Sequence, residues 1–407
     1  MKTMKTTLNM RSKAMLLVAV IAMMTVSSSR LHADTGSCGG QTTTLPFTDV
    51  PASNIFFCSI AEAYFSALTN GTSPTTYSPT DIVPRQQMAA FIIRTMDQSS
   101  RRASERAMLD QWWTPQSENS LGLTAVGTSP NLVTCDGSDL WVATSDDTVV
   151  RVRASDGSAL GTWTGATGAF GVVAARGKIF ITGLTTPGSL YEIDPTQAPG
   201  IVATLSNGLG GAPFEIAYDG ARLWTANGLG SINIITLTPF SVSLVAQGFN
   251  TPLGILFDGN NIWVADVGDN SLKKLDGNGA ILQSIGVGDG PSHPTFDGTN
   301  IWVPCQSSDT ITVVRVKDSQ GYPLANPFVV ATLSGNGMSG PLAAAFDGER
   351  ILTTNSSGDS VSLWRAADLT PIGSCSTGNS TSPTGTSSNG LNFWIALNTN
   401  PGALARF

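Results

Sequence analysis

The amino-acid sequence predicts an all-β protein: a seven-bladed β-propeller preceded by a small, mainly α-helical domain. Three observations lead to this prediction: an excess of turn residues, one motif that occurs seven times, and a repeat spacing that fits a four-stranded blade. Among the 407 residues are 43 Gly and 22 Pro. Ordinary chains have about 12% Gly plus Pro, so this chain is turn-rich, and its length leaves ample residues to bury a core.

The internal motif reads Pro-x5-Asp-Gly-x2-apolar-Trp and is followed by small residues. Its seven turn glycines are Gly137, Gly177, Gly220, Gly259, Gly298, Gly348 and Gly390. Successive glycines are 40, 43, 39, 39, 50 and 42 residues apart, which is the length of one propeller blade. The Trp, replaced by Phe180 and Leu352 in two copies, is expected to fill the space between neighbouring blades.

Each copy is expected to hold four short strands, because brief apolar runs lie between Gly, Asn and Asp turns. In the fourth copy the expected strands are Gly254–Phe257, Ile262–Ala265, Ser271–Leu275 and Ile281–Ile285. The last copy ends at Phe407 after only a third strand, Gly402–Arg406. The segment Leu121–Val126 matches a fourth strand, so this N-terminal strand is expected to complete the last blade and remove the open sheet edges. The propeller then spans about residues 120–407.

The first 33 residues are expected to be a secretory signal peptide. Met1–Lys13 is cationic, Ala14–Val26 is an apolar run of 13 residues, and Ser27–Ala33 is short and polar, with cleavage expected after Ala33. The apolar run is shorter than the roughly 20 residues that span a bilayer. A retained anchor is therefore the less favoured alternative. We expect a secreted or cell-surface protein with no transmembrane segment in the mature chain.

The charge and the histidine count exclude several classes of function. The formal net charge is −7, and without the five leader cations it would be −12, so nucleic-acid binding is not expected. The chain has two histidines, His32 in the leader and His293. No His-Glu-x-x-His, Gly-x-Ser-x-Gly, Cys-x-x-Cys or phosphate-loop motif is present, which argues against zinc enzymes and nucleophilic hydrolases.

Five cysteines fit an exported protein, in which disulfides persist, and an odd count leaves at least one unpaired. Cys38 and Cys58 are expected to pair, since they are close in sequence and both precede the repeats. Their bridge would close a loop of about 20 residues and stabilise a small domain by roughly 3 kcal/mol. The remaining cysteines are expected to be buried thiols: Cys135, Cys305 and Cys375.

The region between the leader and the repeats has a characteristic order of landmarks. They are Phe47-x-Asp49-Val50-Pro51, a helical pattern at Ile60–Leu68, Asn70-Gly71-Thr72, Tyr77-Ser78-Pro79, and Arg85-Gln86-Gln87-Met88-Ala89 opening a second helical pattern that ends at Met96. Over about 50 residues this order resembles an S-layer homology (SLH) domain. One copy is visible, and the family's Thr-Arg-Ala-Glu signature reads Pro84-Arg85-Gln86-Gln87.

The resemblance implies that residues 34–98 form an SLH-like module that associates with anionic cell-envelope polysaccharide. It places Asp49 and Arg85 at the wall-binding groove. The alternative is that Asp49 caps a turn and Arg85 makes a contact within the fold. Residues 99–119 are expected to form a helical linker to the propeller.

The repeats resemble the secreted NHL, YVTN and streptogramin-lyase-like propellers, which share architecture more than activity. In these families strand one is innermost, and the residues before it lie with the strand two-to-three turns on one face around the central channel. Two residues after each motif Pro, or after Phe170, the seven positions read Leu132, Val172, Glu215, Gly254, His293, Ala343 and Gly385. Glu215 and His293 alone are titratable, and they are candidates for a general acid–base pair in which the carboxylate orients the imidazole.

The streptogramin-lyase-like resemblance also implies a channel-facing His at the position of His293. That family uses further histidines and a magnesium site, whereas His293 is the one His here beyond the leader. The turns on the same face form an acidic rim: Asp146, Asp147, Asp266, Asp269, Asp309 and Asp359. Within the rim, four are candidates for binding calcium or a cationic ligand: Asp266, Asp269, Asp309 and Asp359. The alternative is that they hydrogen-bond the backbone, as Asp in turns commonly does.

We therefore expect an exported surface protein whose SLH-like module positions a propeller that binds a protein or small-molecule ligand, with no enzymatic turnover and no cofactor apart from calcium. The alternative from another class is a lyase or hydrolase that acts on the channel face through His293 and Glu215. A third is a structural surface-layer component without a small ligand. An enzyme requires these two side chains to lie within reach of one another.

Overall fold

The computed structural model describes residues 35–38, 41–65, 69, 71–81, 122–318 and 320–407. The chain divides into two compact units, Met1–Ser99 and Ser100–Phe407. The expected signal peptide, Arg85, the expected second helix and the expected linker lie outside the described residues. No helix in the described part of the chain is long and apolar enough to cross a membrane.

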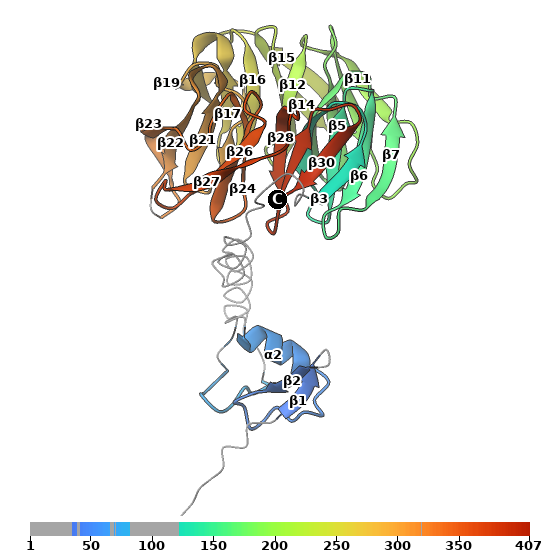
Figure 1. Cartoon of the computed structure of the whole chain (residues 1–407), viewed down its shortest axis with the longest axis vertical. Helices are drawn as coiled ribbons and strands as arrows, with labels where there is room; N and C mark the ends of the chain where they lie inside the picture. Colours follow the sequence, from blue (N-terminus) through green and yellow to red (C-terminus); the bar gives the residue numbers. More distant parts are fainter. Residues whose placement is uncertain (1–34, 39–40, 66–68, 70, 82–121, 319) are drawn as a thin grey trace, which may run out of the picture. The chain divides into compact units, whose positions relative to one another are not determined.

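Residues 122–407 form the predicted seven-bladed β-propeller, in which seven four-stranded antiparallel sheets surround a common axis (Figure 1). The first sheet holds β4 (Pro130–Cys135), β5 (Asp139–Thr144), β6 (Thr148–Arg153) and β7 (Ala159–Thr164). The second holds β8 (Ala169–Ala175), β9 (Lys178–Gly183), β10 (Gly188–Ile193) and β11 (Ala203–Leu209). The third holds β12 (Pro213–Tyr218), β13 (Arg222–Asn227), β14 (Ser231–Leu237) and β15 (Phe240–Val245). The fourth holds β16 (Pro252–Phe257), β17 (Ile262–Asp266), β18 (Ser271–Leu275) and β19 (Ile281–Gly286).

The fifth sheet holds β20 (Thr295–Phe296), β21 (Asn300–Cys305), β22 (Thr310–Lys317) and β23 (Pro323–Ser334). The sixth holds β24 (Pro341–Phe346), β25 (Arg350–Asn355), β26 (Ser360–Arg365) and β27 (Pro371–Ser376). The seventh holds β28 (Pro383–Ser388), β29 (Phe393–Leu397), β30 (Gly402–Arg406) and β3 (Gly122–Val126). Short 3-10 turns lie between the second and third strands of two sheets: η2 (Val267–Asp269) and η3 (Gln306–Ser308).

The N-terminal strand closes the ring. β3 pairs antiparallel with β30, from Gly122 opposite Arg406 to Val126 opposite Gly402, and Figure 1 shows the two strands side by side. The start and the end of the propeller therefore share one sheet, so separating the ends would require breaking this strand pair.

The first strand of every sheet is the innermost one, and each contacts the first strand of the next sheet, from β4 around the ring to β28 and back to β4. Because the strands alternate in direction, the turns between second and third strands lie on the same face as the loops that lead into the first strands. We call this the upper face and the opposite one the lower face, as they are seen in Figure 1.

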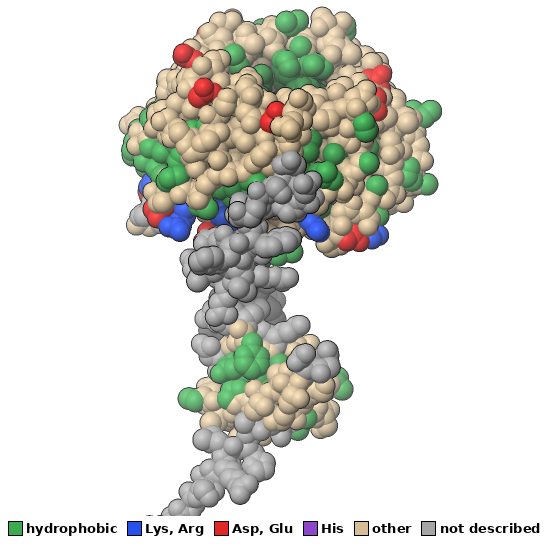
Figure 2. Space-filling model, in the orientation of Figure 1, with side chains coloured by type: hydrophobic (Ala, Val, Ile, Leu, Met, Phe, Trp, Pro, Cys, Tyr) green, Lys and Arg blue, Asp and Glu red, His purple; other side chains and the backbone are tan. Residues whose placement is uncertain are grey.

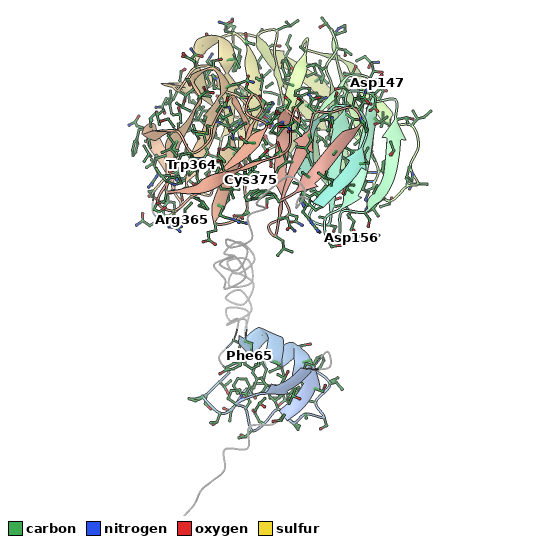
Figure 3. All side chains as sticks on the ribbon, in the orientation of Figure 1. Phe65, Asp147, Asp156, Trp364, Arg365 and Cys375 are labelled. Atoms are coloured by element: carbon green, nitrogen blue, oxygen red, sulfur yellow. A yellow bond between two sulfur atoms is a disulfide. The ribbon has the colours of Figure 1, made fainter. Side chains whose placement is uncertain are left out.

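Charge is divided unequally between the two faces. Besides the acidic rim, Glu215 and Asp289 lie on the upper face, which makes eight carboxylates there against one cation, Lys273. The other Lys and Arg of the propeller lie toward the lower face: Arg151, Arg153, Arg176, Lys178, Arg222, Lys274, Arg315, Lys317, Arg350, Arg365 and Arg406. On the side shown in Figure 2, the Lys and Arg of the propeller gather along its lower edge. Figure 3, in the same orientation, labels Asp147 above and Arg365 below.

A hydrogen bond between the turn Asp and the motif Trp joins the first two strands in four of the sheets. In the third sheet, Oδ1 of Asp219 accepts the backbone N–H groups of Ala221 and Arg222 at 2.8 and 2.6 Å. Its Oδ2 accepts the indole N–H of Trp224 at 2.7 Å. The equivalent bonds elsewhere are Trp141 to Asp136, Trp263 to Asp258, and Trp302 to Asp297. The Asp of the motif therefore fixes both the turn and the large side chain that follows it.

The motif Trp residues fill the space between sheets, as predicted. Trp141, Trp224, Trp263, Trp302 and Trp394 are all fully buried. Trp224 of the third sheet, for example, belongs to an apolar cluster that includes Ile255 and Val264 of the fourth. A buried aromatic side chain of this size removes a large apolar area from water, so these contacts stabilise the packing of neighbouring sheets.

The described part of the N-terminal unit does not support the prediction of a mainly α-helical domain, of which the expected second helix lies outside the described residues. It holds a two-stranded antiparallel sheet, β1 (Thr35–Cys38) and β2 (Gln41–Thr44), and one helix, α2 (Phe57–Phe65). The helix begins three residues before the expected start. The alternation of small and polar residues in the hairpin, TGSC and QTTT, gives no apolar pattern from which strands could be predicted.

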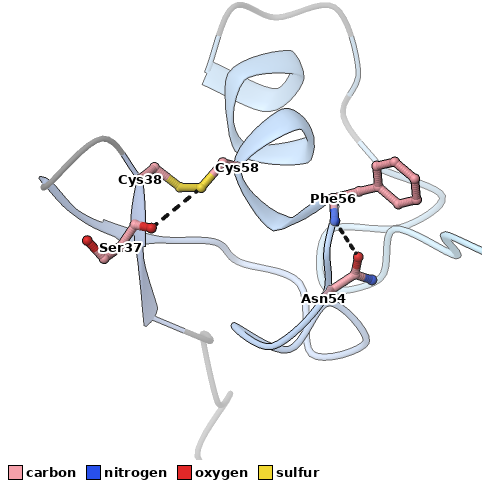
Figure 4. The surroundings of a disulfide bond; sticks show 5 residues. All are labelled: Ser37, Cys38, Asn54, Phe56 and Cys58. Carbon is pink, nitrogen blue, oxygen red and sulfur yellow. Dashed lines mark hydrogen bonds between the residues drawn. A yellow bond between two sulfur atoms is a disulfide. The ribbon is translucent and has the colours of Figure 1, made fainter.

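The small unit is held by an apolar core and one disulfide. Its buried core residues are Leu45, Phe47, Val50, Phe57, Ile60 and Ala61. Cys38 and Cys58, the pair expected from the sequence, form a disulfide with their Cα atoms 5.5 Å apart, and it joins β1 to α2 (Figure 4). Cys305 and Cys375 are buried, while Cys135 is half-buried. Burial raises the pKa of the Cys305 thiol, which disfavours the reactive thiolate.

The Asp–Trp bond should make a measurable, pH-dependent contribution to the free energy of unfolding. Burial opposes ionisation of Asp219, but the hydrogen bonds from Arg222, Trp224 and Ala221 outweigh it and hold the pKa of this carboxyl below its usual range. Asp219→Asn should therefore cost about 1–2 kcal/mol at neutral pH. A depressed pKa in the folded state stabilises above the ordinary carboxyl pKa, and this contribution is lost as the pH falls through the folded value.

The measurement is denaturant unfolding of both proteins between neutral pH and pH of about 3, followed by tryptophan fluorescence. The difference between wild type and Asp219→Asn should shrink toward the acid end. Asp276→Asn is the matched control, because the Asp276 carboxylate accepts two turn amides, from Asn278 and Ala280, but no indole N–H. An equal loss in the two variants would contradict a specific role of the indole bond.

Candidate functional site

The two titratable candidates lie on inner segments of different sheets. Glu215 is the third residue of β12 in the third sheet. His293 precedes β20 in the fifth sheet, where its N–H donates to Leu342 O at 3.0 Å and its carbonyl accepts from Ala344 N at 3.1 Å. These two backbone bonds fix the His293 segment against the first strand of the sixth sheet.

The strand register corrects one of the seven inner positions that were derived by comparing the repeats. Ala169 pairs with Gly183 in the second sheet as Pro130 pairs with Thr144 in the first. The first strand of the second sheet is therefore one residue longer than the motif spacing implies, and Gly171 takes the place that the sequence assigned to Val172. The corrected seven positions are Leu132, Gly171, Glu215, Gly254, His293, Ala343 and Gly385.

Glu215 and His293 are in direct contact, although a whole sheet separates their own sheets. Oε2 of Glu215 lies 3.2 Å from Nδ1 of His293. The same oxygen accepts the backbone N–H of Ile255, in the intervening fourth sheet, at 2.8 Å. The side chain of His293 is 5% exposed and that of Glu215 is 19% exposed. The carboxylate therefore bridges three consecutive sheets near the axis.

Small residues at the equivalent positions allow the inner segments of neighbouring sheets to lie close together. A Cβ on Gly254 would lie 2.2 Å from Ser292 O, and one on Gly171 would lie 2.4 Å from Phe214 O. Neighbouring first strands thus approach too closely at these positions for a side chain. Because Gly254 has none, the Ser292–Pro294 segment lies directly against β16, and the carboxylate that accepts the N–H of Ile255 also reaches His293.

Two aromatic rings stand beside the pair, and the sequence analysis did not identify them. Phe170 and Phe214 are half-buried and meet edge to face with ring centroids 5.2 Å apart. The ring of Phe170 also lies 6.1 Å from that of His293. In the sequence, each of these aromatic residues stands directly before one of the seven inner positions: Phe214 before Glu215, and Phe170 before Gly171. This shared placement is the signal that could have identified them. We call Phe170, Phe214, Glu215 and His293 the mouth cluster.

The hydrogen bonds of the pair define what it can do chemically. With Nδ1–H donating to the carboxylate, the neutral imidazole carries its lone pair on Nε2. Neither Nε2 of His293 nor Oε1 of Glu215 has a hydrogen-bond partner among the described residues. The cluster therefore presents one proton acceptor and one anionic oxygen that the protein itself does not use, beside two apolar rings.

The candidate ligand-binding carboxylates of the acidic rim hold loops in place. Gly340 N donates to Asp309 at 2.6 Å, and Ser380 N and Ser382 N donate to Asp359 at 2.7 and 2.8 Å. The bond from Ser382, followed by that from Ser380, keeps the pKa of Asp359 below its usual range despite some burial. Each of these two carboxylates thus fixes the loop that leads into the next first strand.

Asp266 and Asp269 share a buried lysine. The Nζ of Lys273 lies 2.6 Å from Asp266 and also contacts Asp269, while Asp266 accepts the N–H groups of Asn250 and Thr251 at 2.9 and 2.8 Å. The bonds to Asn250 and Thr251 are backbone hydrogen bonds of the kind expected as the alternative to ligand binding. A calcium or ligand role for the four rim residues stays a prediction.

The described residues contain no group of three or more His, Cys, Asp or Glu that could hold a metal ion. Glu215 and His293 supply two such side chains, and the facing atoms Oε2 and Nδ1 are already paired with each other. These residues do not fit the magnesium site implied by the lyase-like resemblance. In the N-terminal unit, the Asp49 carboxylate accepts the N–H groups of Tyr77 and Ser78 at 2.8 and 2.7 Å, a contact within the fold.

Comparison with known proteins supports the fold. No protein-family model matches the chain, and no curated protein matches it. Among solved structures, a streptogramin B lyase is similar with a TM-score of 0.56 and 13% identity, over 71% of this chain and 97% of that one. The β-propeller domain of Cps50 (Swd1) from Myceliophteria thermophila is similar with a TM-score of 0.55 and 11% identity, over 70% and 98%. In all, 1688 chains match, so the fold by itself selects no activity.

The close approach at Gly254 gives a direct prediction. Gly254→Ala should force the Ser292–Pro294 segment away from β16, because the added Cβ would meet Ser292 O at 2.2 Å and Pro294 Cδ at 2.5 Å. We expect a loss of about 1–3 kcal/mol in the free energy of unfolding, and displacement of His293 from Glu215 in a crystal structure of the variant.

Gly286→Ala is the matched control, because a Cβ at Gly286 in β19 of the same sheet would meet nothing within 4 Å. It should leave the stability nearly unchanged. A Gly254→Ala protein that is as stable as this control, with the Glu215–His293 contact preserved, would contradict the packing argument.

Proposed function

We propose that the propeller is a ligand-binding platform whose binding site is the mouth cluster on its upper face. The observation that carries this proposal is the contact of Glu215 with His293, made from the third and fifth sheets. Ligand sites in proteins combine mostly apolar walls with a few polar groups that fix orientation. The mouth cluster has this composition: two partly exposed aromatic rings, an imidazole acceptor and a carboxylate oxygen.

The surrounding ring supports binding because it holds these groups in place without the ligand. His293 is fixed through backbone bonds to β24, and Glu215 is fixed through the N–H of Ile255. A preorganised site loses little conformational freedom on binding, which improves affinity. A plugged, purely structural propeller would have no need for a buried imidazole with an unused nitrogen.

A second candidate function is lyase-like or hydrolytic chemistry at the same cluster. The observation that favours it is the hydrogen bond between the carboxylate and Nδ1, which leaves Nε2 as the acceptor. In such a reaction Nε2 would take a proton from the substrate, and Glu215 would stabilise the imidazolium that forms. The similar solved structure named as a streptogramin B lyase belongs to that class of enzyme, but at 13% identity the likeness concerns the fold.

We also propose that the protein is exported and that its N-terminal unit associates with the cell envelope. The supporting observations are the leader-like sequence of residues 1–33, the SLH-like order of landmarks, and the Cys38–Cys58 disulfide, a bond that persists in oxidising compartments. The wall-binding roles of Asp49 and Arg85 belong to this proposal.

The binding proposal is tested by soaking crystals of the protein with a library of small fragments. Bound compounds should gather at the mouth cluster, because it offers apolar and polar groups together. Thermal shifts measured with the same compounds should disappear in Phe170→Ala and remain in Phe240→Ala, which alters an exposed Phe on the outer strand β15. Compounds that bind only elsewhere, or equal shifts in both variants, would refute the assignment.

The same compounds distinguish binding from turnover. Each bound compound is incubated with wild type and with His293→Gln, and products are sought by mass spectrometry. Binding without products supports the platform, whereas products that wild type forms and His293→Gln does not would establish the lyase-like alternative.

The envelope proposal predicts that the mature full-length protein sediments with isolated cell envelopes. Arg85→Ala should reduce the sedimented fraction severalfold, because the SLH resemblance places this cation at the groove for an anionic polysaccharide. Arg365→Ala, which removes an exposed cation from the propeller, is the control. Equal sedimentation of the two variants, or none for wild type, would contradict the proposed role of Arg85.

A further inference from the structure

The mouth cluster lies on a face whose charge is strongly one-sided. Eight carboxylates stand there against the single cation Lys273, and that lysine is buried and paired with Asp266 and Asp269. The lower face carries the other eleven Lys and Arg of the propeller. A surface of one sign attracts ligands of the opposite sign and raises their local concentration.

The cluster itself offers the groups that bind an organic cation. Oε1 of Glu215 has no hydrogen-bond partner among the described residues, so it is available to a ligand. The half-buried ring of Phe170 lies beside the ring of His293, and it meets the half-buried ring of Phe214 at a steep angle, 84° between planes. Aromatic faces attract cations through the ring quadrupole, and two rings set nearly perpendicular can contact a compact cationic group from two sides.

The propeller already uses this combination of ring and carboxylate around several of its own cations, and Lys273 is the example on the upper face. Nζ of Lys273 lies 5.5 Å from the centroid of the Phe249 ring and 2.6 Å from a carboxylate oxygen of Asp266. There the cation is supplied by the protein. In the mouth cluster the carboxylate and the rings are present, and none of the described Lys or Arg lies on the upper face to fill that place apart from Lys273 itself.

The unused nitrogen of His293 points to a ligand independently of the charge. Its side chain is 5% exposed, its ring lies 6.1 Å from that of Phe170, and Nε2 has no partner among the described residues. Nε2 is not among the buried side-chain atoms that lack a partner, so solvent can reach it. A ligand that covers this atom must replace its hydrogen bond to solvent. A ligand hydroxyl that donates to Nε2 would do so.

We propose that the mouth cluster selects a small organic cation: an alkylammonium compound that carries a hydroxyl group a few bonds from the charge. The ammonium group lies against Phe170 and Phe214 near Oε1 of Glu215, and the hydroxyl group donates to Nε2 of His293. This inference rests on the proposed function, since it names the class of ligand for the same site.

The test compares choline with 3,3-dimethyl-1-butanol, which has the same shape and hydroxyl group but no charge. Calorimetric titration of the full-length protein should show choline binding about tenfold more tightly than the neutral alcohol, with the difference decreasing as salt is added. Glu215→Gln keeps the size of the side chain and removes its charge, so it should abolish the preference. Phe170→Leu should weaken choline binding severalfold, whereas Asp276→Asn, a carboxylate change on the lower face, should not.

The outcomes separate the two proposals. Equal binding of both probes, reduced in Phe170→Leu, would overturn the cation selectivity and leave the mouth cluster as a ligand site. No binding of either probe, with soaked fragments still found at the cluster, would also overturn the selectivity alone. No binding of either probe and no fragments at the cluster would overturn both.

Discussion

The seven first strands approach one another closely around the axis, and the rest of the propeller depends on this packing. At Gly171, Gly254 and Gly385 a Cβ would lie between 2.2 and 2.5 Å from a backbone oxygen of the neighbouring sheet's inner segment. Such distances leave no room for a side chain, so the inner ring has little freedom to rearrange. Pairing of β3 with β30 closes the ring, which prevents the sheets from spreading apart.

The repeated motif determines the propeller fold, and the residues that depart from the repeat form the candidate site. In four sheets the motif Asp accepts the indole N–H of the motif Trp, so turn and packing are fixed in the same way. The inner positions are small in most sheets, but Glu215 and His293 break that pattern with large polar side chains. A local departure of this kind in an otherwise consistent fold is what function commonly requires. The lack of a side chain at Gly254 lets the Ser292–Pro294 segment pack directly against β16, and this packing brings His293 within reach of Glu215.

The number of sheets and the strand that closes the ring could be predicted from the sequence, because each repeat carries a complete turn motif and the last one lacks a strand. The register of the second sheet was predicted wrongly by one residue, since its turn glycine, Gly177, lies one residue further from the start of the first strand than Gly137 does in the first sheet. The contact between Glu215 and His293 could not be predicted, because it depends on the curvature of the ring and on Gly254. The rings of Phe170 and Phe214 were missed for a related reason: an aromatic residue on an inner strand looks like core until its exposure is known. The hairpin of the N-terminal unit has no apolar alternation to reveal it.

The central claim is that Glu215 orients His293 and leaves Nε2 available to a ligand. The most direct measurement is nitrogen NMR of protein labelled with ¹⁵N-histidine, in which His293→Gln assigns the signals. The account predicts that neutral His293 carries its proton on Nδ1 in wild type, and that Glu215→Ala shifts the population toward the form protonated on Nε2. A neutral His293 that carries its proton on Nε2 in wild type, unaffected by Glu215→Ala, would contradict the account.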